Sequence, residues 1–167
     1  YGTRQARKPN VLAESSATAV STKLAGIDYG TVRIGIALAD AEVGIASPHA
    51  TYTRGGEDAD AAFFRKFVED DAIVRLVVGL QVHLDGRESQ KSAEARAFGK
   101  WLEETTGVPV VYIDERFTTA EANDLLSVPG MTNKRKKARR DQLAAQLMLA
   151  AYLESDRRGQ TDPGAID

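Results

Sequence analysis

The stretch that decides the fold runs from Lys23 to Asp40 and reads KLAGIDYGTVRIGIALAD. Its apolar residues form two segments on either side of a turn at Gly30, which is the pattern of two β-strands joined as a hairpin. Side chains alternate between the two faces of a strand, so Leu24, Gly26 and Asp28 are expected on one side. Because both faces are largely apolar, the hairpin is expected inside a sheet that is covered on both faces.

One carboxylate, that of Asp28, interrupts this apolar pattern near the end of the first strand. A carboxylate in such a place needs hydrogen bonds, a cation or a raised pKa, because removing its charge from water costs free energy. Two interpretations are open at this point. Asp28 either binds the amides of the turn that follows, or belongs to a metal or phosphate site.

The segments that follow the hairpin predict further strands and helices. A third strand is expected over Val43–Thr53, and Pro48 favours an edge position for it. Apolar residues at helical spacing predict helices over Asp58–Asp70 and Ser89–Thr106. Apolar runs of strand length predict strands over Ile73–Leu80, beside the first strand, and over Val108–Ile113. The fold class expected is α/β, with a mixed five-stranded sheet: the first three strands are antiparallel, the others are parallel, and helices cover both faces.

The last third of the chain contains a strongly basic segment. A short helix through Leu125 and Leu126 is expected after the last strand, followed by a loop, and the final helix is expected to start near Asp141. The apolar stripe of that helix is predicted at Ala144, Leu147, Met148, Ala151 and Tyr152. The loop before it carries six positive charges, on Lys134, Arg135, Lys136, Lys137, Arg139 and Arg140, and is expected to contact nucleic-acid phosphates.

Three acids are expected at one end of the sheet: Asp28, Glu115 directly after the last strand, and Asp141 on the final helix. Clustered carboxylates repel one another unless a cation lies between them, and oxygen ligands favour Mg²⁺ or Mn²⁺. Two such ions, about 4 Å apart, can activate water for hydrolysis of a phosphodiester. Simpler interpretations also remain open: Glu115 can pair with Arg116, and Asp141 can be a helix-start residue favoured by the helix dipole.

Composition narrows the possible functions. The chain has 167 residues, of which 43% are hydrophobic, enough for one core, and its 22 basic and 24 acidic residues show no overall basic bias. The absence of cysteine excludes disulfides and thiolate sites and fits a cytoplasmic protein. We expect a flexible tail over residues 1–22, one nuclease domain over 23–154 and a polar tail over 155–167, with no membrane contact.

Four motifs in order resemble the YqgF/RuvX family: Gly26-Ile-Asp-Tyr-Gly with Arg33-Ile-Gly, Val78-Gly-Leu with Asp85-Gly86, Asp114-Glu-Arg-Phe-Thr-Thr119, and Arg140-Asp-Gln-Leu-Ala-Ala145. The resemblance implies an RNase H-like fold and a nuclease. That nuclease would either process the 5′ end of the 16S ribosomal RNA precursor or resolve Holliday junctions. It places the family's acids at Asp28, Glu115 and Asp141. The chain departs from the family pattern at Gln81 and His83, where Pro and Asn are usual.

Several further residues are candidates for substrate binding. Arg33 and Arg116 can orient the acids or bind phosphate through bidentate hydrogen bonds. Thr118 and Thr119 can bind substrate or simply cap a helix. The sequence does not choose between structured RNA and branched DNA as the nucleic-acid partner, and the chain is expected to be a monomer or a weak homodimer.

Two other functions are compatible with the same residues. The Asp28-Tyr-Gly-Thr turn is of the type that binds phosphate in actin-like ATPases, although those proteins use two lobes and this chain has room for one. A non-catalytic RNA-binding or ribosome-assembly factor on the same scaffold is the other alternative, because a fold alone does not establish an activity.

Overall fold

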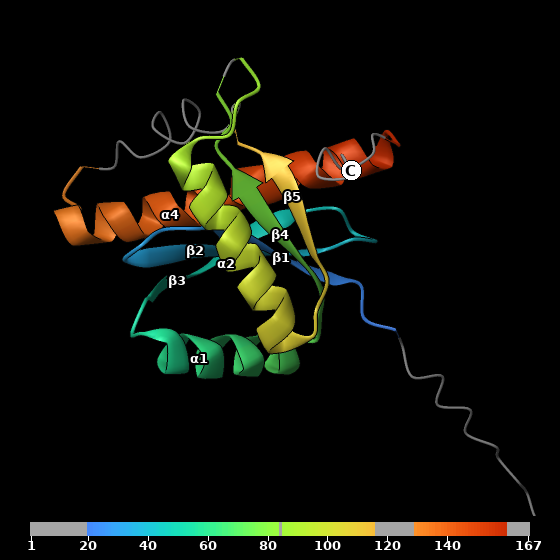
Figure 1. The fold of residues 1–167 in the computed structure, drawn as a ribbon, viewed down its shortest axis with the longest axis horizontal. Coiled ribbons are helices and arrows are strands. Elements are labelled where there is room, and N and C mark those ends of the chain that lie inside the picture. Colours follow the sequence, from blue (N-terminus) through green and yellow to red (C-terminus); the bar gives the residue numbers. More distant parts are fainter. Residues whose placement is uncertain (1–19, 84, 116–128, 160–167) are drawn as a thin grey trace, which may run out of the picture.

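A computed structural model of the chain describes residues 20–83, 85–115 and 129–159. Its centre is a five-stranded sheet of order β3-β2-β1-β4-β5 (Figure 1). The antiparallel strands are β1 (Lys23–Asp28), β2 (Arg33–Asp40) and β3 (Ala46–Thr53), whereas β4 (Ile73–Leu80) pairs parallel with β1, and β5 (Val110–Asp114) pairs parallel with β4. The mixed sheet predicted from the sequence is confirmed.

Helices cover both faces of this sheet, as predicted (Figure 1). Helices α1 (Glu57–Asp70) and α2 (Gln90–Thr106) pack on one face, and the long helix α4 (Asn133–Arg157) packs on the other. The alternation of side chains along β1 separates two cores, because Ile27 packs among residues of α1 and α2 while Leu24 packs against α4. One hairpin therefore contributes to both hydrophobic cores.

The face of the sheet under α4 is lined by very small residues. A Cβ atom on Gly35 of β2 would lie 2.0 Å from the carbonyl oxygen of Asp141, and a Cβ atom on Gly26 of β1 would lie 2.9 Å from the Cβ of Leu149. Both positions therefore have to be glycine if α4 is to lie this close to the sheet. The helix is also tied to β3, since Thr51 Oγ1 donates to the Ala138 carbonyl at 2.6 Å and Gln146 Nε2 donates to the Ala46 carbonyl at 3.0 Å.

The basic segment predicted as a loop is instead the first two turns of α4. The helix begins at Asn133, and its N-cap is Thr132, whose side chain accepts a hydrogen bond from the Arg135 amide. The expected start near Asp141 was therefore wrong, and Asp141 lies in the third turn. Lys, Arg and Ala all favour helix, so an N-cap threonine before them is enough to start the helix earlier.

The predicted apolar stripe of α4 was also displaced. Met148 is buried as expected, but the other buried residues are Ala145, Leu149 and Leu153, while Ala144 and Leu147 remain partly exposed. Ala145 and Leu149 occupy the space above Gly26, which sets the rotation of the helix about its axis. Ala151 and Tyr152 pack at the side of this core.

Strand β3 forms one edge of the sheet, as Pro48 predicted, and its register against β2 shifts between Ile36 and Ala37. It starts at Ala46 and not at Val43, because the chain is still turning at Gly44, whose φ is +74°. At the other edge β5 starts at Val110, two residues later than predicted. The predicted short helix around Leu125 and Leu126 lies outside the described residues.

None of the helices in the described parts of the chain is long and apolar enough to cross a membrane.

We predict that Gly35→Ala lowers the free energy of unfolding by about 1–3 kcal/mol. The added methyl group would overlap the backbone of α4 at Asp141, so the helix itself would have to move away from the sheet. Gly55→Ala is the matched control, since a Cβ there would meet only side-chain atoms, the Cβ of Ala59 at 3.2 Å and the Tyr52 hydroxyl at 4.0 Å. Urea unfolding of both variants measures the difference. Equal stabilities would contradict the proposed role of Gly35 in helix docking.

Candidate active site

Asp28 is the last residue of β1 and sits directly opposite Gly35 of the neighbouring strand. It borders a cleft of about 380 Å³ at this end of the sheet. Residues of the β1–β2 turn form one wall of the cleft, and the other residues come from the segment after β4 and from two helices: Gln81, Lys91, Glu94 and Asp141. Residues from four parts of the chain thus meet around Asp28.

Glu115 directly follows β5 and is buried, with 9% of its surface exposed. Its amide donates a hydrogen bond of 2.9 Å to the Leu80 carbonyl, which continues the pairing of β5 with β4. The carboxylate occupies space left by a missing side chain, since a Cβ atom on Gly79 would lie 1.8 Å from Glu115 Oε1. Gly79 of the central strand therefore makes room for the acid.

Asp141 reaches the same region from α4. Its backbone lies against Gly35, and Gly35 is the partner of Asp28 in the β1–β2 ladder. Arg33, the first residue of β2, donates a hydrogen bond of 2.8 Å from Nε to Asp141 Oδ2. This ion pair is partly buried and fixes the direction of the Asp141 carboxylate.

The electrostatics of Asp28 and Glu115 show how closely the acids are placed. Burial raises the pKa of Asp28 well above its usual range, and the Glu115 and Asp141 charges raise it further. Burial also raises the pKa of Glu115, while hydrogen bonds from Asp28 and Gln81 oppose that shift. The side-chain hydrogen bond between these two acids raises the pKa of Asp28 and lowers that of Glu115, and the nearby positive charge of Lys91 lowers the pKa of both acids.

A divalent cation would suit the chemistry of this donor set, because the three acids supply only oxygen atoms and repel one another when ionised. In the described parts of the chain, however, no three histidine, aspartate or glutamate side chains already stand in an arrangement that could hold a metal ion. The directions of the side chains account for this result: Asp141 is turned to Arg33, and Asp28 is bonded to Glu115.

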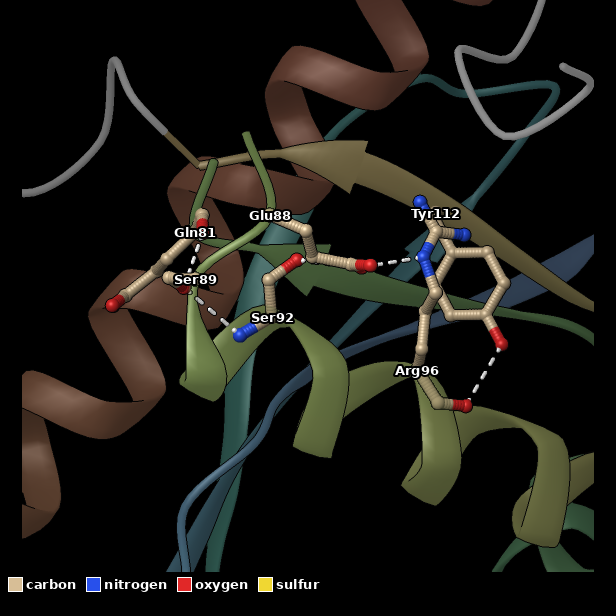
Figure 2. Close-up of polar contacts among 6 residues, drawn as sticks. All are labelled: Gln81, Glu88, Ser89, Ser92, Arg96 and Tyr112. Carbon is tan, nitrogen blue, oxygen red and sulfur yellow. Dashed lines mark hydrogen bonds and ion pairs between the residues drawn. The ribbon is translucent and has the colours of Figure 1, made fainter. Parts of the chain in front are cut away.

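The start of α2 is fixed beside the cleft by a chain of hydrogen bonds (Figure 2). Ser89 caps the helix by accepting from the Ser92 amide at 3.0 Å, and its hydroxyl donates to the Gln81 carbonyl at 2.6 Å. Glu88 accepts from Ser92 Oγ and from Arg96 Nε, at 3.0 Å and 2.6 Å. These bonds connect the end of β4 to the first turns of α2, which carry Lys91 and Glu94.

The structure thus places Asp28, Glu115, Asp141 and Arg33 together, whereas Arg116, Thr118 and Thr119 lie outside the described residues. Lys134, Arg135, Lys136, Lys137, Arg139 and Arg140 lie on the first turns of α4 and not in a loop. Sequence reasoning did not assign Lys91 or Glu94 to the cleft. The signal was present, because both follow β4, and the carboxyl ends of parallel strands are where such sheets build their sites.

The model of the family described as RuvX, Holliday junction resolvase, matches residues 22–155. The chain belongs to this family. A Rhodopirellula baltica protein named "Putative pre-16S rRNA nuclease" is 45% identical over 139 residues, which cover 83% of this chain and 80% of that protein. A Neisseria gonorrhoeae protein of the same name is 40% identical over 127 residues, covering 76% and 84%.

Two solved structures share the fold of this RuvX-family chain. T. thermophilus RuvC in complex with a Holliday junction substrate matches with a TM-score of 0.53 and 14% identity, over 85% of this chain and 99% of RuvC. The fowlpox virus resolvase with Holliday junction DNA matches with a TM-score of 0.50 and 11% identity, over 80% and 97%. The RNase H-like fold predicted from the sequence is confirmed.

We predict that Asp28→Asn stabilises the metal-free protein at neutral pH. The pKa of Asp28 is raised in the folded state, so its contribution to stability is full at pH values below the unfolded pKa, and is lost as the pH rises through the folded pKa. The neutral amide does not lose this contribution. The melting temperature should rise by roughly 2–4 °C for each kcal/mol gained, and the gain should vanish near pH 4.

Thermal unfolding in EDTA between pH 4 and pH 8 measures this difference. Asp70→Asn is the control, because Asp70 is an exposed acid in an i,i+4 pair with Lys66 and should change stability little at any pH. If the Asp28→Asn variant is no more stable than the parent at pH 8, the pKa of Asp28 is not raised in the folded protein.

Proposed function

We propose that this chain is a metal-dependent endonuclease that hydrolyses phosphodiester bonds of structured RNA, with the 5′ end of the 16S rRNA precursor as its substrate in ribosome biogenesis. The observation that carries the proposal is the convergence of Asp28, Glu115 and Asp141, from three separate elements, at one end of the sheet. Acids held this close to one another destabilise a protein unless they bind something positive.

The same three acids are the residues that would hold the cation, Mg²⁺ or Mn²⁺. When bound, the cation would supply the activation of a water molecule and the neutralisation of charge on the phosphodiester. The protein's own contribution is positioning. Arg33 orients Asp141, Gly79 makes room for Glu115, and Lys91 adds a positive charge at the cleft where a phosphate would lie.

The basic turns of α4 support a nucleic-acid substrate. On a helix, residues three, four and seven positions apart share a face, so Lys134 and Lys137 share the face of Asp141. Arg135 and Arg139 instead line a separate hollow of about 480 Å³ beside Pro48, together with Gln142 and Gln146. This shared face supports Lys134 and Lys137 as the side chains that bind phosphates near the cleft.

The names of the relatives favour precursor 16S rRNA as the substrate. The description of the family favours a second candidate, the resolution of Holliday junctions. The purified protein, given a 16S rRNA precursor and a four-way DNA junction side by side with Mg²⁺, distinguishes the two functions by its products. Failure to cut either substrate would favour the non-catalytic assembly factor.

We predict that Asp28→Asn lowers the rate of Mg²⁺-dependent cleavage by on the order of 100-fold or more, because loss of a partner that merely orients a metal ligand already costs 10–100-fold. Mg²⁺ should raise the melting temperature of the parent but not that of the variant. Asp70→Asn serves as the control for both measurements. A folded Asp28→Asn variant that cuts at the parent's rate would exclude Asp28 as a metal ligand.

We also predict that Lys134→Ala combined with Lys137→Ala weakens nucleic-acid binding irrespective of sequence. Two lost phosphate contacts should flatten the log–log dependence of affinity on salt by about 1.4–1.8 units. The matched control is Arg65→Ala combined with Lys66→Ala, which removes two exposed charges from α1 on the other face of the sheet. Fluorescence anisotropy at several salt concentrations measures the slope for each double variant. Equal slopes for the two would show that Lys134 and Lys137 do not contact nucleic-acid phosphates.

A further inference from the structure

A pocket of about 210 Å³ opens on the face of the molecule that carries α1 and α2, opposite α4. It is lined by Arg54 after β3, by Glu57 at the start of α1, and by Phe98 and Trp101 of α2. Nothing in the proposed chemistry of the three acids uses these four residues. Their side chains combine two aromatic rings, one guanidinium group and one carboxylate.

The aromatic rings form a continuous stack. The ring of Trp101 lies over that of Phe98, with centroids 5.4 Å apart and an angle of 28° between the planes. Phe98 is buried, with 6% exposed, whereas Trp101 is partly exposed. The indole therefore rests on a fixed ring and still presents part of its surface to the pocket.

Arg54 is held in place before any ligand arrives. Its Nε donates a hydrogen bond of 2.9 Å to Asp60, which is fully buried and also accepts from the Tyr52 hydroxyl and the Gly55 amide. Its guanidinium carbon lies 5.2 Å from the centroid of the Phe98 ring. Because the guanidinium is already ordered, little conformational entropy is lost when a planar ligand stacks on it.

Tyr29 connects this pocket to the candidate active site. It follows Asp28 in the chain and lines the same cleft. Its ring lies 5.0 Å from that of Phe98, and the Arg54 guanidinium lies 5.7 Å from its centroid. A strand whose phosphate lies at Asp28 therefore has the aromatic pocket within reach of a neighbouring nucleotide.

We propose that the pocket formed by Arg54, Glu57, Phe98 and Trp101 binds an unpaired nucleobase of the substrate strand, next to the phosphate that is cut. Every base has a π-face that can stack on an aromatic ring or a guanidinium group. The Glu57 carboxylate accepts hydrogen bonds, which suits the amino groups of guanine, adenine or cytosine. A base inside a duplex is already stacked on both faces, so the pocket selects single-stranded segments.

This inference rests on the proposed function for the position of the strand, but it can be tested without cleavage. Trp101 is the only tryptophan of the chain, so the intrinsic tryptophan fluorescence reports on this pocket alone. In EDTA, a short single-stranded RNA is expected to quench this fluorescence at saturation. The same RNA in a full duplex, or with abasic residues in place of its bases, should leave the fluorescence unchanged.

Variants test the energetic contribution of the ring. Trp101→Leu should weaken the binding of labelled single-stranded RNA by about tenfold, which corresponds to about 1.4 kcal/mol, whereas Trp101→Phe should stay close to the parent. Phe63→Leu is the matched control, because Phe63 is a partly exposed aromatic residue of α1 that stacks on Tyr52 and does not line the pocket. Glu57→Gln should alter the preference among bases and not the quenching itself.

The outcomes separate this inference from the proposed function. Cleavage by the parent without any quenching, or equal quenching by abasic RNA, would overturn the base pocket and leave the nuclease intact. Quenching that depends on the bases, in a protein that cuts neither substrate, would support the pocket and overturn the nuclease. Equal binding by Trp101→Leu and the parent would also overturn the pocket.

Discussion

The short distance between α4 and the middle of the sheet is the constraint on which the rest of this structure depends. It requires glycine at positions 26 and 35, because a single added carbon at either would press against the helix. A Cβ on Gly79 of the neighbouring strand would likewise meet both Met148 of α4 and the Glu115 carboxylate. The glycines that leave room for the helix thus also leave room for the acids.

The same docking creates an electrostatic conflict that apolar packing has to offset. Asp28 and Glu115 are bonded to each other, and both have raised pKa values, mainly because they are removed from water. The free-energy cost of burying these two acids is offset by the hydrophobic cores on the two faces of the sheet, and one hairpin contributes to both cores. Arg33 pairs with Asp141 and so holds one of the three acids in place, while Asp28 and Glu115 are hydrogen-bonded to each other.

The sheet was predictable from the sequence because its signals are local. Alternation along residues 23–40 identified both faces of the hairpin, and Pro48 identified the edge strand. The basic segment was misassigned because six charges resemble a solvated loop, and the decisive residue, Thr132, is a single cap whose effect depends on helix docking. Pattern reasoning therefore located Asp141 on the correct helix but put it in the wrong turn.

Convergence of distant residues was harder to predict than the elements themselves. The three acids could be grouped because two of them end strands of the same sheet and a docked helix carries the third. Arg54, Glu57 and Trp101 carry no such signal, since each belongs to a different segment, and an aromatic residue at helical spacing is equally consistent with core packing. The contacts of Phe98 with Tyr29, Trp101 and Arg54 show that these segments form one surface.

Pro48 and the register shift beside it have a consequence for the contact of this protein with copies of itself. An edge strand presents a row of unpaired N–H and carbonyl groups, on which a strand from another chain can assemble and begin a fibril. Proline has no N–H to offer, and the irregular register prevents a straight partner strand from pairing along the whole edge. The β3 side of the sheet is thus a poor template for intermolecular strand addition.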